Sequence, residues 1–265
     1  MHLNLRGAWA LISSSWLSWV QHRAFFFLLA FGWMIPPLIS LFIWYEASSS
    51  QPVHGITQAD FVTYYLLFIL VNQLTYSQTN WTAGDRIRSG DMNILLLSPL
   101  PPLIHVLSAE IAGKVVYMLF VVPVVAVLAL VFHPALHLSL AQCLWFVPAL
   151  LLAWLLRFFW GYWLALLAFW ATRADALLAV QDALIFLLAG QVAPVVLLPG
   201  ILQSLAIVLP FRYMIGFPIE LLLGQLNPAH MLTGFAYQIA WFVVAAGLSL
   251  LIWRVGVRHY TAIGG

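Results

Sequence analysis

The chain has 265 residues, of which 64% are hydrophobic and 7% are charged, and its mean hydropathy is +1.01. Soluble domains carry about 25% charged residues, so this composition excludes a soluble globular protein and indicates one that lies in a lipid bilayer. The net charge of +2 is too small to indicate a nucleic-acid partner. The single cysteine, Cys143, excludes an internal disulfide and a cysteine-rich metal site.

Residues 1–23 differ in pattern from the rest of the chain. Apolar side chains recur there at helical spacing, while serine, glutamine and arginine fall between them; the apolar positions are Leu5, Trp9, Ile12, Trp16 and Trp19. This pattern predicts an amphipathic helix that lies at the membrane interface. The segment lacks the cleavage site of a secretory signal, so we expect it to be retained.

Apolar blocks along the chain predict the membrane spans. A crossing takes roughly 20 to 25 residues, which allows about six in a chain of this length. We therefore expect an all-α integral membrane protein with one transmembrane domain over residues 1–265 and no soluble domain. The six predicted spans cover approximately residues 24–45, 61–81, 115–132, 143–170, 177–198 and 232–253.

The connection between the fifth and sixth predicted spans, residues 199–224, is apolar but broken by proline. Such a backbone survives at membrane depth only where protein or a water-lined cavity satisfies its amide groups. We expect a re-entrant pair of short helices that enters from the outside and forms a gate; the alternative is a short excursion at the interface. The candidate gate residues are Pro199, Pro210, Phe211, Arg212 and Glu220.

Basic residues predict the orientation, because they gather on the cytoplasmic side of membrane proteins. An N-terminus in the cytoplasm places only Arg212 outside and Arg157 within the membrane, and both termini are then cytoplasmic. The residues that fall on the cytoplasmic side in this arrangement are Arg6, Arg23, Arg86, Arg88, Lys114, Arg173, Arg254 and Arg258.

No catalytic or nucleotide-binding motif is visible. The chain lacks a G-x-x-x-x-G-K-[S/T] phosphate loop and a G-x-S-x-G nucleophile elbow, so we expect neither ATP binding by that loop nor hydrolysis. His133 and His137 are one helical turn apart, but they flank a proline in a short loop, and we favour an interfacial turn over a metal site there.

The most charged cytoplasmic connection covers residues 84–114. A short amphipathic helix after Gly90, ended by prolines from Pro99 onward, is expected to present Leu95, Leu96 and Leu97 as an apolar knob. Such a knob can fill a groove on a soluble partner. The neighbouring charges that would fix its register are Arg86, Arg88 and Asp91. The alternative is a helix that lies flat on the bilayer.

Arg157 is the one basic residue predicted deep inside a span. A lone arginine there costs about 2.5 to 3.5 kcal/mol, so a partner must compensate it. Acidic candidates are few, namely Asp182 in the fifth span and Glu220 in the proline-broken connection. Arg157 is then either a structural tie inside the bundle or a contact for a polar substrate group.

Two sequence patterns carry a resemblance. The first cytoplasmic connection reads I-R-S-G-x-x-x-x-L-L-x-S-P from Ile87 to Pro99, and a late block reads L-P-G-x-L followed by L-P-F-x-Y, with Pro218 and Gly224 after it. Together with the amphipathic start and six spans, these patterns resemble the permeases of ABC-2 type exporters over nearly the whole chain.

The resemblance implies a subunit of the bacterial inner membrane, surrounded by lipid, that pairs with an identical or related second permease. Separate ABC ATPase subunits would bind ATP and magnesium, so this chain would hold no cofactor itself. The connection 84–114 would be the coupling element, and the pathway for a hydrophobic or amphipathic substrate would lie between two permeases. A secondary transporter or channel without an ATPase is the alternative, with Arg157, Asp182 and the proline-broken segment as its site.

Overall fold

The computed structural model describes residues 9, 13, 16, 23–136, 138–171 and 173–260. The predicted amphipathic helix at residues 1–23 therefore lies almost wholly outside the described residues. Within the described ranges the secondary structure consists of helices, apart from an isolated bridge between Val53 and Ile56. The all-α prediction is confirmed for this part of the chain.

Four of the described helices are long and apolar enough to cross a membrane. They are α2 (Arg23–Ala47), α6 (Pro102–Phe132), α7 (Leu140–Leu166, continued by the 3-10 turn Leu167–Phe169) and α12 (Pro228–His259). At 1.5 Å per residue, the 32 residues of α12 extend about 48 Å, more than the roughly 30 Å of a hydrocarbon core. Membrane crossing by the chain is thus supported, and the ends of α12 reach beyond the core.

Two predicted spans are shorter in the structure than in the sequence analysis. The second becomes α3 (Gln58–Thr75), because the backbone turns away from the helix at Tyr76, and the fifth becomes α8 (Ala174–Leu188), which ends before Gly190 at φ +93°. Neither is among the four candidate spans. The predicted ends at residues 81 and 198 are wrong, and the count of six crossings remains a prediction.

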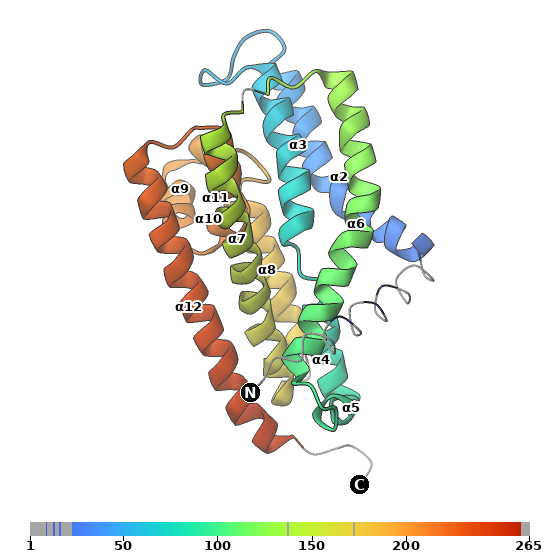
Figure 1. Cartoon of the computed structure of the whole chain (residues 1–265). Coiled ribbons are helices and arrows are strands. Elements are labelled where there is room, and N and C mark those ends of the chain that lie inside the picture. Colours follow the sequence, from blue (N-terminus) through green and yellow to red (C-terminus); the bar gives the residue numbers. More distant parts are fainter. Residues whose placement is uncertain are drawn as a thin grey trace.

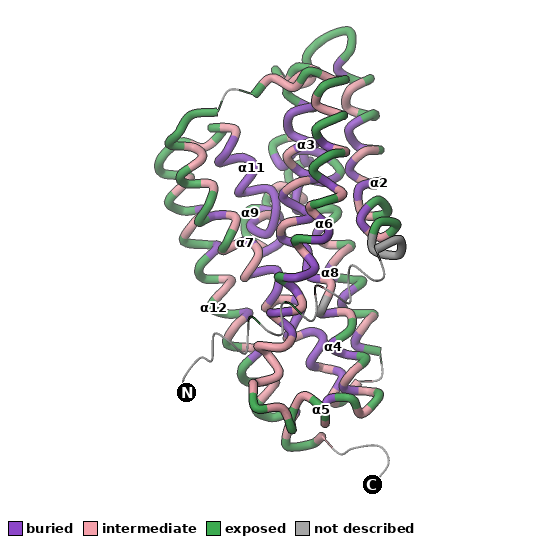
Figure 2. The backbone as a smooth tube through the Cα atoms, turned by 45° about the vertical axis from the view of Figure 1, so that its right-hand side comes forward, coloured by how far each residue is buried: buried purple, intermediate pink, exposed green. Residues whose placement is uncertain are grey.

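Helix α3 is the centre of the bundle. It packs against α2, α6, α7 and α11 (Gly216–Leu222), while α7 packs along most of α12. Figure 2 shows buried residues concentrated on α3 and α11, with exposed ones along the outer helices. On α3, the aromatic side chains of Phe61, Tyr65 and Phe68 are completely buried. The core of the protein is therefore built around a helix that carries polar residues at both ends.

The proline-broken connection forms a 3-10 turn (Val195–Leu197) followed by three short helices, α9 (Gly200–Val208), α10 (Phe211–Met214) and α11. Pro199 and Pro210 stand directly before α9 and α10, where the fixed φ of proline suits a helix start. All seven residues of α11 are buried, whereas Ile201 on α9 is 76% exposed. The segment forms three short helices where a pair was predicted, and its re-entry into the membrane remains a prediction.

The connection predicted to lie in the cytoplasm contains α4 (Thr79–Arg88) and α5 (Met92–Leu96). It is shorter than predicted, because α6 begins at Pro102 and residues 103–114 belong to its first turns. The boundary at Lys114 was wrong because proline at the first helical position starts a helix as readily as it stops one. Figure 1 shows α4, α5 and the C-terminal end of α12 together at one end of the bundle, opposite the connections between α2 and α3 and between α6 and α7.

A test of the packing concerns Gly161 on α7, where a methyl group would lie 2.4 Å from Nδ2 of Asn80. That nitrogen donates to the Phe158 carbonyl at 3.0 Å. We expect Gly161→Ala to displace Asn80 and lower the free energy of unfolding by about 1 to 3 kcal/mol. The thermal midpoint of the purified protein measures it.

The matched control is Gly247→Ala on α12, where no atom lies within 4 Å of the added methyl group. Both changes improve helix propensity, so only the clash separates them. Equal midpoints for the two variants would contradict the packing of α4 against α7.

Candidate functional site

The first functional region is the buried junction where α3 ends at Thr75 and α4 begins at Thr79. Arg157 of α7 is 4% exposed and reaches this junction. Its Nη1 donates to Oδ1 of Asn72 at 2.8 Å, to Oγ1 of Thr75 at 3.1 Å and to the Asn72 carbonyl at 3.3 Å. The guanidinium therefore supplies donors to the C-terminal end of α3, where helix carbonyls lack partners of their own.

Lys114 of α6 meets the same junction from another side. Its ammonium group donates to the Tyr76 carbonyl at 2.6 Å and forms an ion pair with Glu110 at 2.9 Å. Arg157 also lies 5.1 Å from the centre of the Tyr76 ring, a cation–π distance. Two cations thus converge on the negative end of the α3 dipole, which favours positive charge there.

Asp182, the predicted partner of Arg157, does not form an ion pair with it within the described residues. The Oδ2 atom of Asp182 is buried and has no hydrogen-bond partner there, and Oδ1 receives only a 3.5 Å contact from Gln181. The side chains that accept hydrogen bonds directly from Arg157 are Asn72 and Thr75. Sequence reasoning missed these two residues because it searched for acidic side chains, whereas a helix end offers uncharged acceptors.

The second region is the cytoplasmic connection that holds the predicted coupling residues. Arg88 pairs with Asp85 and, at 3.2 Å, with Asp175 at the start of α8. The hydrogen bond that Arg88 donates to Asp85 raises the pKa of Arg88 above its ordinary value. Gly90 has φ +86°, a conformation that favours glycine, and Ser89 donates to Asp91 at 2.7 Å. Arg86 lies on the last turn of α4, and Pro99 is exposed beyond α5.

Helix α5 presents a different apolar surface from the one predicted. Ile94 and Leu97 are 71% and 87% exposed, and Leu96 is 39% exposed. Leu95 instead packs with buried Met92 against the cluster that includes Val106 and Tyr162. The prediction included the exposed Leu96 and Leu97 and omitted Ile94, and it expected Leu95 to be exposed, whereas Leu95 packs inward. The spacing of Met92 and Leu95, three residues apart, was the available signal that these two share the inward face.

The end of α12 ties this surface to the bundle. The Tyr260 hydroxyl donates to the Gly90 carbonyl at 2.8 Å, and the Tyr260 ring packs on Phe169 with ring centres 6.0 Å apart. The α4–α5 turn is therefore held by the residue that follows α12, which also packs on the 3-10 turn after α7. We call Ile94, Leu96 and Leu97 the cytoplasmic knob.

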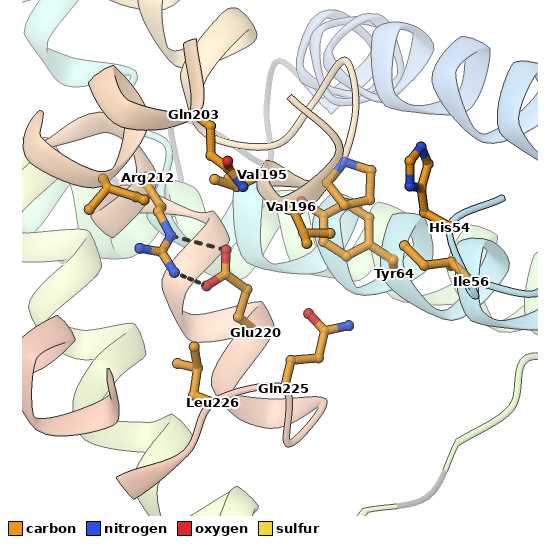
Figure 3. A pocket seen from close by; sticks show the side chains of 12 residues that line it. His54, Ile56, Tyr64, Val195, Val196, Gln203, Arg212, Glu220, Gln225 and Leu226 are labelled. Atoms are coloured by element: carbon orange, nitrogen blue, oxygen red, sulfur yellow. Dashed lines mark hydrogen bonds and ion pairs between the residues drawn. The ribbon is translucent and has the colours of Figure 1, made fainter. Parts of the chain in front are cut away.

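The third region is a cavity of about 550 Å³ near the opposite end, which we call the outer cavity. Figure 3 shows Arg212 and Glu220 side by side on its wall. The guanidinium binds the carboxylate through both Nε, at 3.1 Å, and Nη2. The structure thus brings together these two predicted gate residues. Of the other three, Phe211 packs on Trp160, whereas Pro199 and Pro210 stand at helix starts.

Several residues of the outer cavity were not predicted from the sequence. Tyr64 of α3 donates its hydroxyl to the Gly190 carbonyl at 2.9 Å, which joins α3 to the end of α8. His54, Gln203 and Gln225 line the same space from three other segments. No motif links them, because only the fold brings these segments to one cavity. Among the described residues, no three His, Cys, Asp or Glu side chains are grouped to hold a metal ion.

Comparison with known families decides the identity of the fold. A family model described as ABC-2 family transporter protein matches residues 31–264. The chain belongs to the ABC-2 transporter family. No curated protein and no solved structure matches it. Membership makes the chain a membrane component of transport, and it agrees with the resemblance found in the coupling and late sequence blocks.

The buried junction makes a specific demand on Arg157. Arg157→Leu removes the donor from Asn72 and Thr75, and each buried acceptor left unpaired costs about 1 to 3 kcal/mol. We expect a lower yield of folded protein in the membrane and a lower thermal midpoint, measured by size-exclusion chromatography after heating.

The control is Arg254→Leu, which removes an exposed arginine of α12. It should leave both the yield and the midpoint close to those of the unchanged protein. A normal midpoint for Arg157→Leu would show that the junction does not depend on this side chain.

Proposed function

We propose that this ABC-2 family chain is the permease subunit of an ATP-driven exporter in the bacterial inner membrane. It forms, with an identical or related second permease, the pathway for a hydrophobic or amphipathic substrate. Separate ABC ATPase subunits bind ATP and magnesium and dock on the cytoplasmic knob. The observation that carries this proposal is an exposed apolar knob on a short helix fixed to the bundle at both of its ends.

The knob has the features of a docking element. Its exposed apolar side chains follow the charged residues Arg86, Arg88 and Asp91 in the chain, which suits a groove with an apolar centre and a polar rim. Its base is firm, because Met92 is 3% exposed and the adjoining turn is bonded to Tyr260. A rigid element can transmit a displacement that a flexible linker would absorb.

The junction between α3 and α4 supports transmission from the knob into the membrane domain. Asn80 of α4 donates to the Phe158 carbonyl of α7, one residue from Arg157, which holds α3. A push on α4 therefore reaches α3 and α7 together. The family membership supplies the ATP-driven partner class, and the absence of a phosphate-binding loop in the sequence agrees with a separate ATPase.

The topology that belongs to this proposal has six crossings and both termini in the cytoplasm. Helices α3 and α8 supply the two further crossings, shielded by the four longer ones. The segment from Pro199 to Gly224 enters the membrane from the outside and returns, with buried α11 as its protein-packed arm. The alternative without an ATPase uses Arg157 as a substrate site, and the bonds from Arg157 to α3 speak against that role.

Aspartate in the knob tests the docking. Ile94→Asp and Leu97→Asp each place a charge in an apolar groove, which costs several kcal/mol when no partner charge compensates it. We expect the ATPase encoded beside this permease to be lost from pull-downs with the tagged permease, while folding is unchanged because both side chains are exposed.

Leu136→Asp is the matched control, since Leu136 is 50% exposed at the opposite end of the bundle. It should retain the ATPase. Full copurification and unchanged ATP hydrolysis with both knob variants would place the coupling surface elsewhere.

Sidedness is tested with single cysteines in a Cys143→Ala background. Ser49→Cys, in the exposed α2–α3 connection, should react with an impermeant thiol reagent added to intact cells. Leu97→Cys should react only after the membrane is opened. The reverse pattern would invert the proposed orientation, and labelling of both residues from outside would remove α3 as a crossing.

A further inference from the structure

We propose that the outer cavity binds the head group of an amphiphile, and that this head group carries no net charge. The inference deepens the proposed exporter function, because it names the chemical class of molecule that the outward side of the permease accepts. It is carried by the charge balance of the cavity wall, by polar side chains without partners, and by the apolar surface beside the cavity.

The charges of the wall cancel. Arg212 and Glu220 form a two-point ion pair, and their side chains are only 16% and 10% exposed. An adjoining cavity of about 310 Å³ adds Asp60, whose carboxylate already accepts from the backbone and hydroxyl of Thr57. A net anion binds Arg212 only if it displaces Glu220, and a net cation binds Glu220 only if it displaces Arg212. A neutral or zwitterionic group meets neither penalty.

Hydrogen-bonding capacity remains open in the outer cavity. Within the described residues, the side chains of His54, Gln203 and Gln225 form no hydrogen bond in the protein. Figure 3 shows Gln203 and Gln225 on either side of Glu220, all three around one space. A glutamine amide both donates and accepts, so this set suits hydroxyl groups and zwitterions alike. The volume of about 550 Å³ falls within the roughly 300 to 1,000 Å³ of small-molecule sites.

Apolar side chains continue from the cavity to the outside of the bundle. Val196 is 66% exposed and Ile207 of α9 is 42% exposed, and both line the cavity. Further along α9, Ile201 is 76% exposed. In a bilayer, such side chains contact acyl chains, so a tail can stay in lipid while the head group occupies the cavity. Arg212 also lines a smaller, mostly apolar cavity of about 210 Å³ beside α12.

Protection of a single cysteine tests this site. The permease with Cys143→Ala and Val196→Cys is placed in nanodiscs of anionic phosphatidylglycerol, and the rate of its reaction with a thiol reagent is measured. Four octyl amphiphiles are added below their micelle concentrations: the maltoside, the phosphocholine, the sulfate and the trimethylammonium. We expect the maltoside or the phosphocholine to slow the reaction at least threefold, and the two charged compounds to leave it unchanged.

Two controls separate binding from general effects on the bilayer. Ser49→Cys, exposed in the α2–α3 connection and outside the lining of both cavities, should not be protected by any of the four compounds. Gln225→Ala, combined with Val196→Cys, should weaken protection about two- to tenfold, as expected for the loss of one hydrogen bond. Gln51→Ala, an exposed glutamine of the α2–α3 connection outside the cavity lining, should leave protection intact.

Each outcome is decisive. Protection by the maltoside alone assigns a polyhydroxylated head group, and protection by the phosphocholine alone assigns a zwitterionic one. Protection only by the sulfate or only by the trimethylammonium overturns the proposal, as does equal protection of both cysteines or no protection at all. The assay needs neither ATP nor an ATPase, so a negative result here does not contradict the exporter function, which the knob variants test. A negative result with the knob variants likewise does not contradict the head-group site.

Discussion

The end of α3 inside the protein is the constraint on which the rest of the structure depends. Helix carbonyls that end in a water-free interior must receive donors from protein, because lipid offers none. Arg157 and Lys114 supply them from α7 and α6. Their charges are tolerable only because the helix dipole, Glu110 and the side chains of Asn72 and Thr75 surround them. Helix α3 can therefore end inside the bundle and α4 can begin there. This arrangement directs α4 and α5 toward the end of the bundle.

The same constraint explains what the sequence could and could not predict. Hydropathy located the apolar helices, and the cost of a buried arginine marked Arg157 as a residue that needs compensation. Its compensating groups escaped notice, since Asn72, Thr75 and a backbone carbonyl are neutral and lie 82 to 85 positions away. Hydropathy also carried the second span past Tyr76, because the residues after the break include apolar Trp81. A helix end is a matter of hydrogen bonding, which composition does not report.

At the outer cavity, by contrast, the sequence indicated two of the residues but not the ion pair that they form. Arg212 and Glu220 were both candidates, but eight positions in an unbroken helix would separate them by about 12 Å along its axis. The break at Ile215, with φ −143°, turns α11 back on α10 and permits the ion pair. His54 and Tyr64 come from elements far away in the sequence, so only tertiary packing places them there.

Helix α3 connects these two regions physically. Near its outer end, Tyr64 and Tyr65 donate to the carbonyls of Gly190 and Val192, just after α8. At its inner end the Arg157 contacts fix it to α7. Its eighteen residues extend about 27 Å as one helix, and buried hydrogen bonds at both ends resist sliding. A displacement of α4 is therefore not confined to α3. Through α3 it reaches the end of α8 and the rim of the outer cavity, which includes Tyr64.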